Sequence, residues 1–298
     1  MTQKDYIKIA KQIADEGIVL LKNDGDVLPL GEKKIAVFGA AQQPGKRAMD
    51  GTRVPPDRVH GFYDSLKTSG ASLDEELRTV YADWHKNEAE NLYRSDENAH
   101  AYPEMELPLS VVEAARDRGY TTGVIVLART SGENHDMQNV EGDYIISPTE
   151  REMIKNVVSV MSETVLVLNI GCAIDLSFLK EYKIDAILYL NAMGEIGMLS
   201  AAEILLGKRS PSGKLTFSFS EKYEDYSSSE GFGQFGGGLI QDYREDVFMG
   251  YRYFDTVKGA DKNLLFPFGH GLSYTRFAVD GVGYTEKDGI PRKVALRL

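Results

Sequence analysis

The chain has 298 residues, of which 42% are hydrophobic and 27% charged, and its formal net charge at pH 7 is −11. This composition is typical of a soluble globular protein that forms one large or two ordinary domains. The acidic balance disfavours a nucleic acid or an anionic membrane as partner, because both require a basic protein face.

The single cysteine, Cys172, excludes an intramolecular disulfide and a zinc site built on several cysteines. It follows an apolar run, so we interpret it as a small buried hydrophobic residue rather than a nucleophile. Residues 1–12 are polar and lack an apolar signal core. No apolar segment approaches the roughly 20 residues that cross a bilayer. We therefore expect a cytoplasmic protein without a membrane partner.

The first half of the chain predicts a helix over residues 5–15 and a short extended segment over 17–23. Four short apolar runs then follow along the chain. Each is too short for a typical helix and is apolar on both faces, which is typical of parallel strands covered by helices on both sides. The four runs are IAVFG from Ile35, GVIVLA from Gly123, VLVLNI from Val165 and AILYL from Ala186.

Helical patterns lie between these runs, over residues 111–119, 147–163 and 195–208. Ser147 and Glu150 have the spacing of a capping box, Pro148 falls in the first turn, and Gly207 is suited to end the last helix. The alternation predicts an α/β fold, with a mostly parallel sheet flanked by helices and right-handed crossovers.

A charged segment, 74–108, interrupts the alternation. Its first half, 74–93, is predicted to be a surface helix and its second half a proline-containing loop. Trp84 lies inside the helical pattern, so we expect it to pack the helix rather than to stack on a sugar.

The pattern changes after residue 222. Residues 227–239 are rich in Gly and Ser and predict a loop, GYRYFD (250–255) is strand-like, and the alternation around KDG (287–289) predicts a hairpin. We predict an α/β sandwich domain over 1–222 and a glycine-rich loop-and-strand segment over 223–276 that closes it and links onward. Residues 277–298 would then open an incomplete β domain.

Few motifs suggest chemistry. VFGAAQQPG (37–45) follows a predicted strand but has neither of the two common phosphate-loop patterns, so a nucleotide site is only weakly supported. The histidines form no H-x-x-x-H pair, and no G-x-S-x-G elbow is present. The sequence therefore indicates no metal and no cofactor.

The remaining candidate is the loop RTSGENHDM (129–137), which follows the second apolar run. Ligands of open α/β sheets bind outside the carboxyl ends of the strands, where Glu133 falls. A carboxyl group there can serve as a general acid if burial raises its pKa. His135 and Asp136 could be its partners. Position alone leaves a solvated loop residue as the favoured alternative for Glu133.

Five ordered stretches change that balance. Together they resemble the second domain of glycoside hydrolase family 3, the β-glucosidase and β-xylosidase family. The resemblance implies an α/β sandwich that packs against a (β/α)₈ barrel, with the active site between the two. The stretches are EGIVLLKNDGDVLPL (16–30), RTSGENHD (129–136), VLVLNIGCAIDL (165–176), SPSGKLTFSF (210–219) and LFPFGHGLSYTRF (265–277).

The resemblance also implies a mechanism. Family members retain the anomeric configuration by double displacement, with an Asp nucleophile from the barrel and a Glu acid/base from the sandwich. The SGE of Ser131, Gly132 and Glu133 matches the place of that acid/base. Glu133 is thus expected to protonate the glycosidic oxygen and later to activate water. Retaining chemistry requires the two carboxyl groups to lie roughly 5–5.5 Å apart.

The chain also departs from the family pattern. Asn134 and His135 follow Glu133 where relatives often read SGEG, and residues 48–59 differ from a glycine/serine-rich turn. The sequence contains no barrel and no barrel nucleophile. We therefore expect a piece of a domain-permuted β-glycosidase, inactive alone, whose tail begins a fibronectin-III-like domain. The alternatives are a non-catalytic carbohydrate-binding or scaffold module of this fold and, less favoured, a nucleotide-binding protein.

Overall fold

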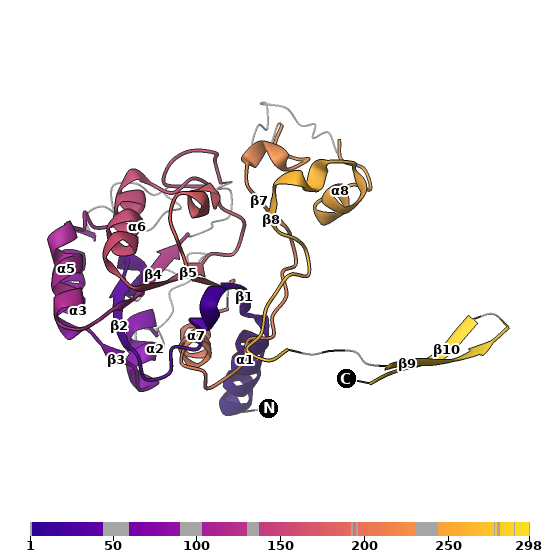
Figure 1. The fold of residues 1–298 in the computed structure, drawn as a ribbon, viewed down its shortest axis with the longest axis horizontal. Helices are drawn as coiled ribbons and strands as arrows, with labels where there is room; N and C mark the ends of the chain where they lie inside the picture. The colour runs from indigo at the N-terminus through magenta and orange to yellow at the C-terminus, as the bar shows by residue number, and fades with distance from the viewer. Residues whose placement is uncertain are drawn as a thin grey trace.

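The structure is a computed structural model that describes residues 2–43, 60–89, 103–129, 137–191, 193–194, 196–230, 244–276, 278, 281–288 and 290–297. Its centre is a six-stranded sheet with the strand order β1-β6-β5-β4-β2-β3 (Figure 1). All neighbouring strands are parallel except β1, which runs antiparallel to β6 at one edge. The strands are β1 (Val19–Asn23), β2 (Lys34–Phe38), β3 (Ser72–Leu73), β4 (Thr122–Ala128), β5 (Glu163–Asn169) and β6 (Ala186–Tyr189).

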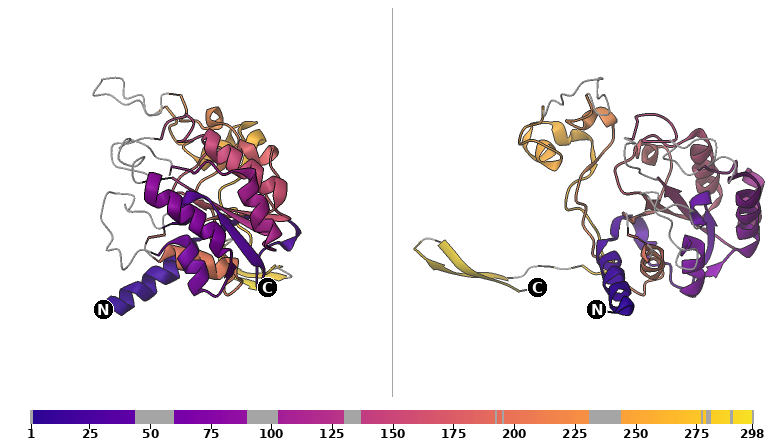
Figure 2. Two further views of the ribbon diagram at one scale, coloured as in Figure 1. Left: turned by 90° about the vertical axis from the view of Figure 1, so that its left-hand side faces the viewer. Right: turned by 180° about the vertical axis from the view of Figure 1, so that it is seen from behind.

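Helices cover both faces of this sheet (Figures 1 and 2). One face packs against α3 (Glu75–Trp84), α5 (Leu109–Asp117) and α6 (Pro148–Val160). The other packs against α2 (Phe62–Thr68) and α7 (Gly197–Leu205), and α1 (Gln3–Gly17) lies beside α7. No helix among the residues described above is long and apolar enough to cross a membrane.

The four predicted parallel strands are confirmed, and their packing explains the continuous apolar runs. Side chains alternate between the two faces of a strand. In β4, Val124 and Val126 point into the core on the α2 and α7 side, while Ile125 and Leu127 point into the core on the α3, α5 and α6 side. Both positions of each pair are buried, so the α/β fold class predicted from the sequence is confirmed.

The predicted helix ends agree with the structure. Ser147 Oγ accepts a hydrogen bond from the amide of Glu150, and the Glu150 carboxylate accepts one from the amide of Ser147, which completes the capping box. Gly207 follows α7 with φ +78°, a left-handed conformation that glycine adopts without strain. The helix predicted over 74–93 is α3, followed by a π-helical turn, η4 (His85–Ala89); Trp84 packs against the core.

The strand predicted for GYRYFD is wrong, because residues 251–256 form helix α8 (Tyr251–Thr256). One helical turn places Tyr251 and Phe254 three residues apart on the same side. Tyr251 stacks on Phe268 with ring centroids 4.0 Å apart, and Phe254 packs edge-on against Tyr226. These aromatic contacts come from distant parts of the chain and override the strand preference of aromatic residues.

The last part of the chain contains two antiparallel strand pairs. β7 (Phe219–Ser220) pairs with β8 (Leu264–Phe266), and β9 (Gly281–Lys287) pairs with β10 (Ile290–Arg297), which confirms the predicted hairpin. Figure 1 shows β9 and β10 well apart from the six-stranded sheet. The start of a β domain at this hairpin, and the three domain boundaries, stay predictions.

Short helical turns complete the described elements. They are the 3₁₀ turns η1 (Asp24–Asp26), η2 (Ala40–Gln42), η5 (Ser177–Lys180), η6 (Tyr223–Asp225) and η7 (Ala260–Asn263).

Candidate functional site at the carboxyl edge of the sheet

The carboxyl ends of β2, β4, β5 and β6 lie along one edge of the sheet, because these strands are parallel. Ligands of open α/β sheets bind outside this edge. The chain leaves the four strands at Gly39, Arg129, Ile170 and Leu190. These positions define the candidate functional site.

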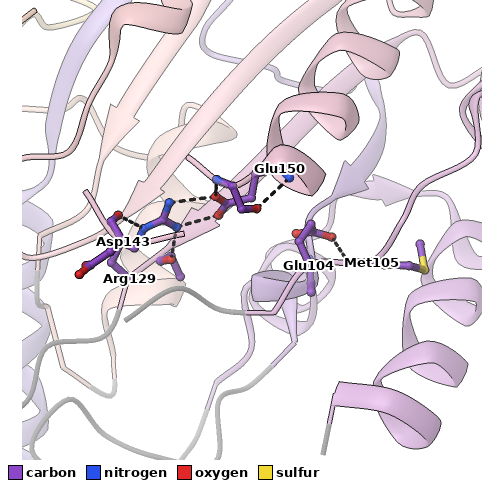
Figure 3. A network of polar contacts seen from close by, with 8 residues as sticks. Glu104, Met105, Arg129, Asp143 and Glu150 are labelled. Carbon is purple, nitrogen blue, oxygen red and sulfur yellow. Dashed lines mark hydrogen bonds and ion pairs between the residues drawn. The ribbon is translucent and has the colours of Figure 1, made fainter. Parts of the chain in front are cut away.

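A buried ion pair lies at the end of β4 (Figure 3). The guanidinium of Arg129 donates to both carboxylate oxygens of Glu150, with Nη1 2.7 Å from Oε1 and Nη2 2.9 Å from Oε2. Arg129 Nε donates to the backbone oxygen of Asp143 at 2.7 Å, and Nη1 also donates to that of Ala128. The Arg129 side chain is completely buried, so its charge is neutralised inside the protein.

This geometry explains how a buried arginine can be stable. Removing two charges from water costs several kcal/mol per ion, and only excellent geometry with further hydrogen bonds offsets that cost. The planar guanidinium supplies a two-pronged bond to Glu150 as well as two bonds to backbone oxygens. The result is a rigid anchor at the first residue after β4.

Asp143 contacts the chain on both sides of residues 130–136. Its backbone oxygen accepts from Arg129 Nε, and its side-chain Oδ2 accepts from the amide of Gln138 at 2.6 Å. The turn that carries Asp143 is closed by backbone bonds, from Tyr144 N to Gln138 O at 3.1 Å and from Ile145 N to Val140 O at 3.1 Å. It is therefore a compact support beside the end of β4.

Glu104 is a second carboxyl group near this edge, apart from the Arg129–Glu150 pair (Figure 3). Its Oε2 accepts from the amide of Ala40 and its Oε1 from the amide of Met105, both at 2.9 Å. Burial raises the pKa of Glu104 to about 8, although the two amide hydrogen bonds act in the opposite direction, and the negative charge of Glu150 raises it further. Glu104 consequently holds its proton more tightly than an ordinary glutamate does.

The backbone after β2 is not arranged as a phosphate cradle. Such a cradle needs peptide N–H groups that are free to bind phosphate oxygens. Here the amide of Gly39 donates to the Tyr81 hydroxyl at 2.9 Å, and the amide of Ala40 donates to Glu104. The protein itself occupies these two donors, which argues against the nucleotide-binding alternative.

Cys172 lies after β5, half-buried, with its Sγ 4.0 Å from Met137 Sδ. Burial raises the pKa of the Cys172 thiol, and the nearby charge of Arg129 opposes this shift. A raised pKa keeps the thiol protonated at neutral pH, and the thiolate is the nucleophilic form. The structure thus supports the packing interpretation of Cys172.

The predicted acid/base itself lies outside the described residues. This holds for Ser131, Gly132 and Glu133, for the possible partners His135 and Asp136, and for the unusual segment 48–59. The structure describes the two residues that flank the loop, Arg129 and Met137. Within the described ranges, no group of three or more His, Cys, Asp or Glu side chains could hold a metal ion.

Sequence reasoning missed the Arg129–Glu150 pair and Glu104. Glu150 was recognised only as a helix-capping residue, and the same carboxylate also receives Arg129. An arginine directly after a fully apolar strand is a signal that could have pointed to a buried partner. Glu104 gave no such signal, because its neighbours in the sequence are those of an ordinary loop.

Comparison with known families agrees with this architecture. Residues 18–274 match the model of the glycosyl hydrolase family 3 C-terminal domain. The chain belongs to this family. The resemblance inferred from the five sequence motifs is thereby confirmed, and Arg129, Glu150 and Glu104 all lie inside the matched region.

Two curated beta-glucosidases match more than nine-tenths of this chain. The beta-glucosidase of Ruminococcus albus is 35% identical over 293 residues, covering 96% of this chain and 30% of the relative. Beta-glucosidase A of Butyrivibrio fibrisolvens is 32% identical, covering 92% of this chain and 36% of the relative. The chain therefore corresponds to one part of much longer proteins.

Solved structures show the same fold. A beta-glucosidase from Paenibacillus barengoltzii superposes with a TM-score of 0.84 at 29% identity, covering 96% of this chain and 32% of that one. Beta-glucosidase 3B from Thermotoga neapolitana in complex with glucose superposes with a TM-score of 0.81 at 30% identity, covering 95% of this chain and 40% of that one.

Proposed function

We propose that this chain is the acid/base-bearing domain of a retaining β-glycosidase that acts on β-glucosides. The observation that carries the proposal is the family match over residues 18–274, with the SGE of residues 131–133 two positions after the buried Arg129. In this proposal Glu133 protonates the glycosidic oxygen and then activates water. The Asp nucleophile comes from a (β/α)₈ barrel outside this chain.

The proposed substrate class rests on the relatives. Those most similar in sequence include several named as beta-glucosidases, and solved neighbours were obtained with glucose and with glycerol. Relatives of 29% identity from Bifidobacterium are named as exo-alpha-(1->6)-L-arabinopyranosidases, so the sugar varies within the family. A β-glucoside is therefore the first substrate to test, and an arabinopyranoside the second.

The acid role of Glu133 predicts a dependence on the leaving group. In a protein that joins this chain to a family 3 barrel, Glu133→Gln should slow hydrolysis of an alkyl β-glucoside roughly a hundredfold or more. An aryl β-glucoside with a good leaving group needs little proton donation, so its glycosylation step should change much less. The measurement is kcat/KM for the two substrates.

The control is Glu152→Gln, which removes an exposed carboxylate of α6 that pairs with Lys155. It should leave both rates unchanged. Equal rates of Glu133→Gln and the parent on both substrates would contradict the acid role. Binding of glucose by the 298-residue chain in calorimetry, with no activity in the joined protein, would instead favour a non-catalytic carbohydrate-binding module.

A further inference from the structure

The residues that flank 130–136 on its two sides are held by one group of side chains. On the β4 side, Arg129 is fixed by Glu150 and by the backbone oxygen of Asp143. On the other side, the amide of Gln138 donates to the carboxylate of the same Asp143. Asp143 thus connects the point where the chain leaves the sheet to the point where it returns.

The first end is tied to a rigid helix. Glu150 belongs to the first turn of α6, and its Oε2 also accepts from the amide of Ser147 at 2.8 Å. The capping box therefore fixes the carboxylate before Arg129 binds to it. The amide of Arg129 in turn donates to the backbone oxygen of Asn169 at the end of β5. Arg129 is consequently held by a helix and by a neighbouring strand.

The second end is tied to the core. Met137 packs against the core cluster formed with α3, α5 and α6, and its sulfur lies near Cys172. The turn from Gln138 to Ile145 is joined to the segment after β5, because the backbone oxygen of Tyr144 accepts from the amide of Asp175 at 2.8 Å. The residues on both sides of 130–136 are thereby attached to the same edge of the sheet, where the parallel strands end.

We propose that Arg129, Asp143 and Glu150 form a clamp that positions the acid/base loop, and that they are positioning residues of the glycosidase reaction. This inference rests on the proposed function, because it takes Glu133 as the acid/base. A general acid must come within hydrogen-bond reach of the oxygen that it protonates. A misplacement of about 1 Å can cost roughly a hundredfold in rate. Fixing both ends of a short loop restricts where its carboxyl group can lie.

Two substitutions release the two ends separately. Arg129→Lys keeps the positive charge but cannot reproduce the two-pronged bond to Glu150. Asp143→Ala removes the acceptor for the Gln138 amide and leaves the backbone oxygen that Arg129 uses. Arg151→Lys is the matched control, because Arg151 also lies in the first turns of α6 but pairs with the exposed Glu181 at the surface.

The kinetic test uses the protein that joins this chain to a barrel. Arg129→Lys and Asp143→Ala should each lower kcat/KM for an alkyl β-glucoside roughly tenfold to hundredfold, since each loses a charge-assisted hydrogen bond that holds one end of the segment. The kcat/KM for an aryl β-glucoside with a good leaving group, which reports the glycosylation step, should change less than about threefold. Arg151→Lys should match the parent on both. A loss of equal size on both substrates, or no loss on either, overturns the positioning role.

A parallel measurement of Glu133→Gln separates the two proposals. If the loss of kcat/KM in Glu133→Gln depends on the leaving group and the loss in the clamp variants does not, the clamp is refuted and the proposed function stands. If Glu133→Gln shows no such dependence, the proposed function fails, and with it any positioning role in acid catalysis. If Arg129→Lys does not fold, Asp143→Ala alone decides the positioning role.

Amide hydrogen exchange tests the clamp on the 298-residue chain without reference to activity. In Asp143→Ala the amide of Gln138 should exchange roughly tenfold faster or more, because its acceptor is lost. The amides in the centre of α6 should exchange as in the parent. Unchanged protection at Gln138, or equal acceleration throughout α6, overturns the clamp as a local device.

Discussion

Glu150 and Glu104 are two carboxyl groups near the same edge of the sheet with different partners. The Glu150 carboxylate accepts two hydrogen bonds from the guanidinium of Arg129 and one from the amide of Ser147. Glu104 receives two peptide N–H groups, which stabilise its charged form less than burial destabilises it. Burial without a cationic partner is thus the cause of the raised pKa of Glu104.

The raised pKa of Glu104 predicts how stability depends on pH. Its folded value of about 8 lies above that of an unfolded glutamate, so the folded protein binds this proton more tightly than the unfolded chain. The stabilising contribution is complete below the unfolded pKa and is lost as the pH rises through the folded pKa. Between these values the contribution falls by at most about 1.4 kcal/mol per pH unit.

Glu104→Gln removes this contribution, so the free energy of unfolding of the variant should fall less than that of the parent between about pH 5 and pH 8. Urea denaturation at several pH values measures the difference. Glu106→Gln, two residues away at an exposed position, should behave like the parent. Parallel curves for Glu104→Gln and the parent would contradict the assignment of a raised pKa.

The turn from β2 into η2 passes very close to the neighbouring strand β4. Gly39 has φ +99°, and a Cβ atom at this position would lie 2.3 Å from the backbone oxygen of Val126 in β4. The turn can therefore accept only a residue without a side chain. This close approach allows the amides of Gly39 and Ala40 to reach Tyr81 and Glu104, so the turn, α3 and the loop before α5 are joined at one point.

A pair of glycine substitutions separates backbone strain from close contact. Gly70 also has a positive φ, +86°, but an added Cβ would meet no atom within 4 Å. Gly70→Ala should lower the free energy of unfolding by about 1–2 kcal/mol through the left-handed backbone alone. Gly39→Ala should lower it by roughly 2–5 kcal/mol, because overpacking against β4 is added. Thermal and urea denaturation would show the difference, and equal effects would refute the close-contact argument.

At the scale of the whole molecule, the segment after β8 returns to β1, the antiparallel strand at the side of the sheet. Leu272 N donates to Leu20 O in β1 at 2.8 Å, His270 Nε2 lies 2.8 Å from Leu21 O, and the Tyr274 hydroxyl donates to Ile204 O in α7 at 2.9 Å. This segment covers an edge that would otherwise expose unpaired backbone groups. Residues far apart in the sequence thus complete the sheet.

Two truncations test this arrangement. A chain that ends at residue 276 loses β9 and β10, which pair with each other, and should keep its melting temperature within about 2 °C. A chain that ends at residue 263 loses β8 and the contacts with β1 and α7, and should melt roughly 5–15 °C lower. Calorimetry of both chains measures this. A large fall on removing only 277–298 would show that the hairpin supports the sandwich.

Local pattern determined much of the architecture from the sequence alone. Each parallel strand is apolar on both faces, and helix signals such as Ser147 and Gly207 act within a few residues of where they stand, so they are readable without a structure. The five ordered motifs likewise pointed to the family, and with it to Glu133. Two features depended on partners elsewhere in the chain. The antiparallel direction of β1 was not predicted, and residues 251–256 were predicted as a strand although they form a helix.

Only the tertiary structure decided the polar arrangement at the sheet edge. The pairing of Arg129 with Glu150, the contact of Asp143 with both flanks of residues 130–136, and the raised pKa of Glu104 all arise from groups brought together by folding. The physical reason is that burial and the choice of partner set the energy of a charged group. Neither burial nor the partner can be inferred from the residues adjacent in sequence, whereas the apolar pattern of a buried strand can.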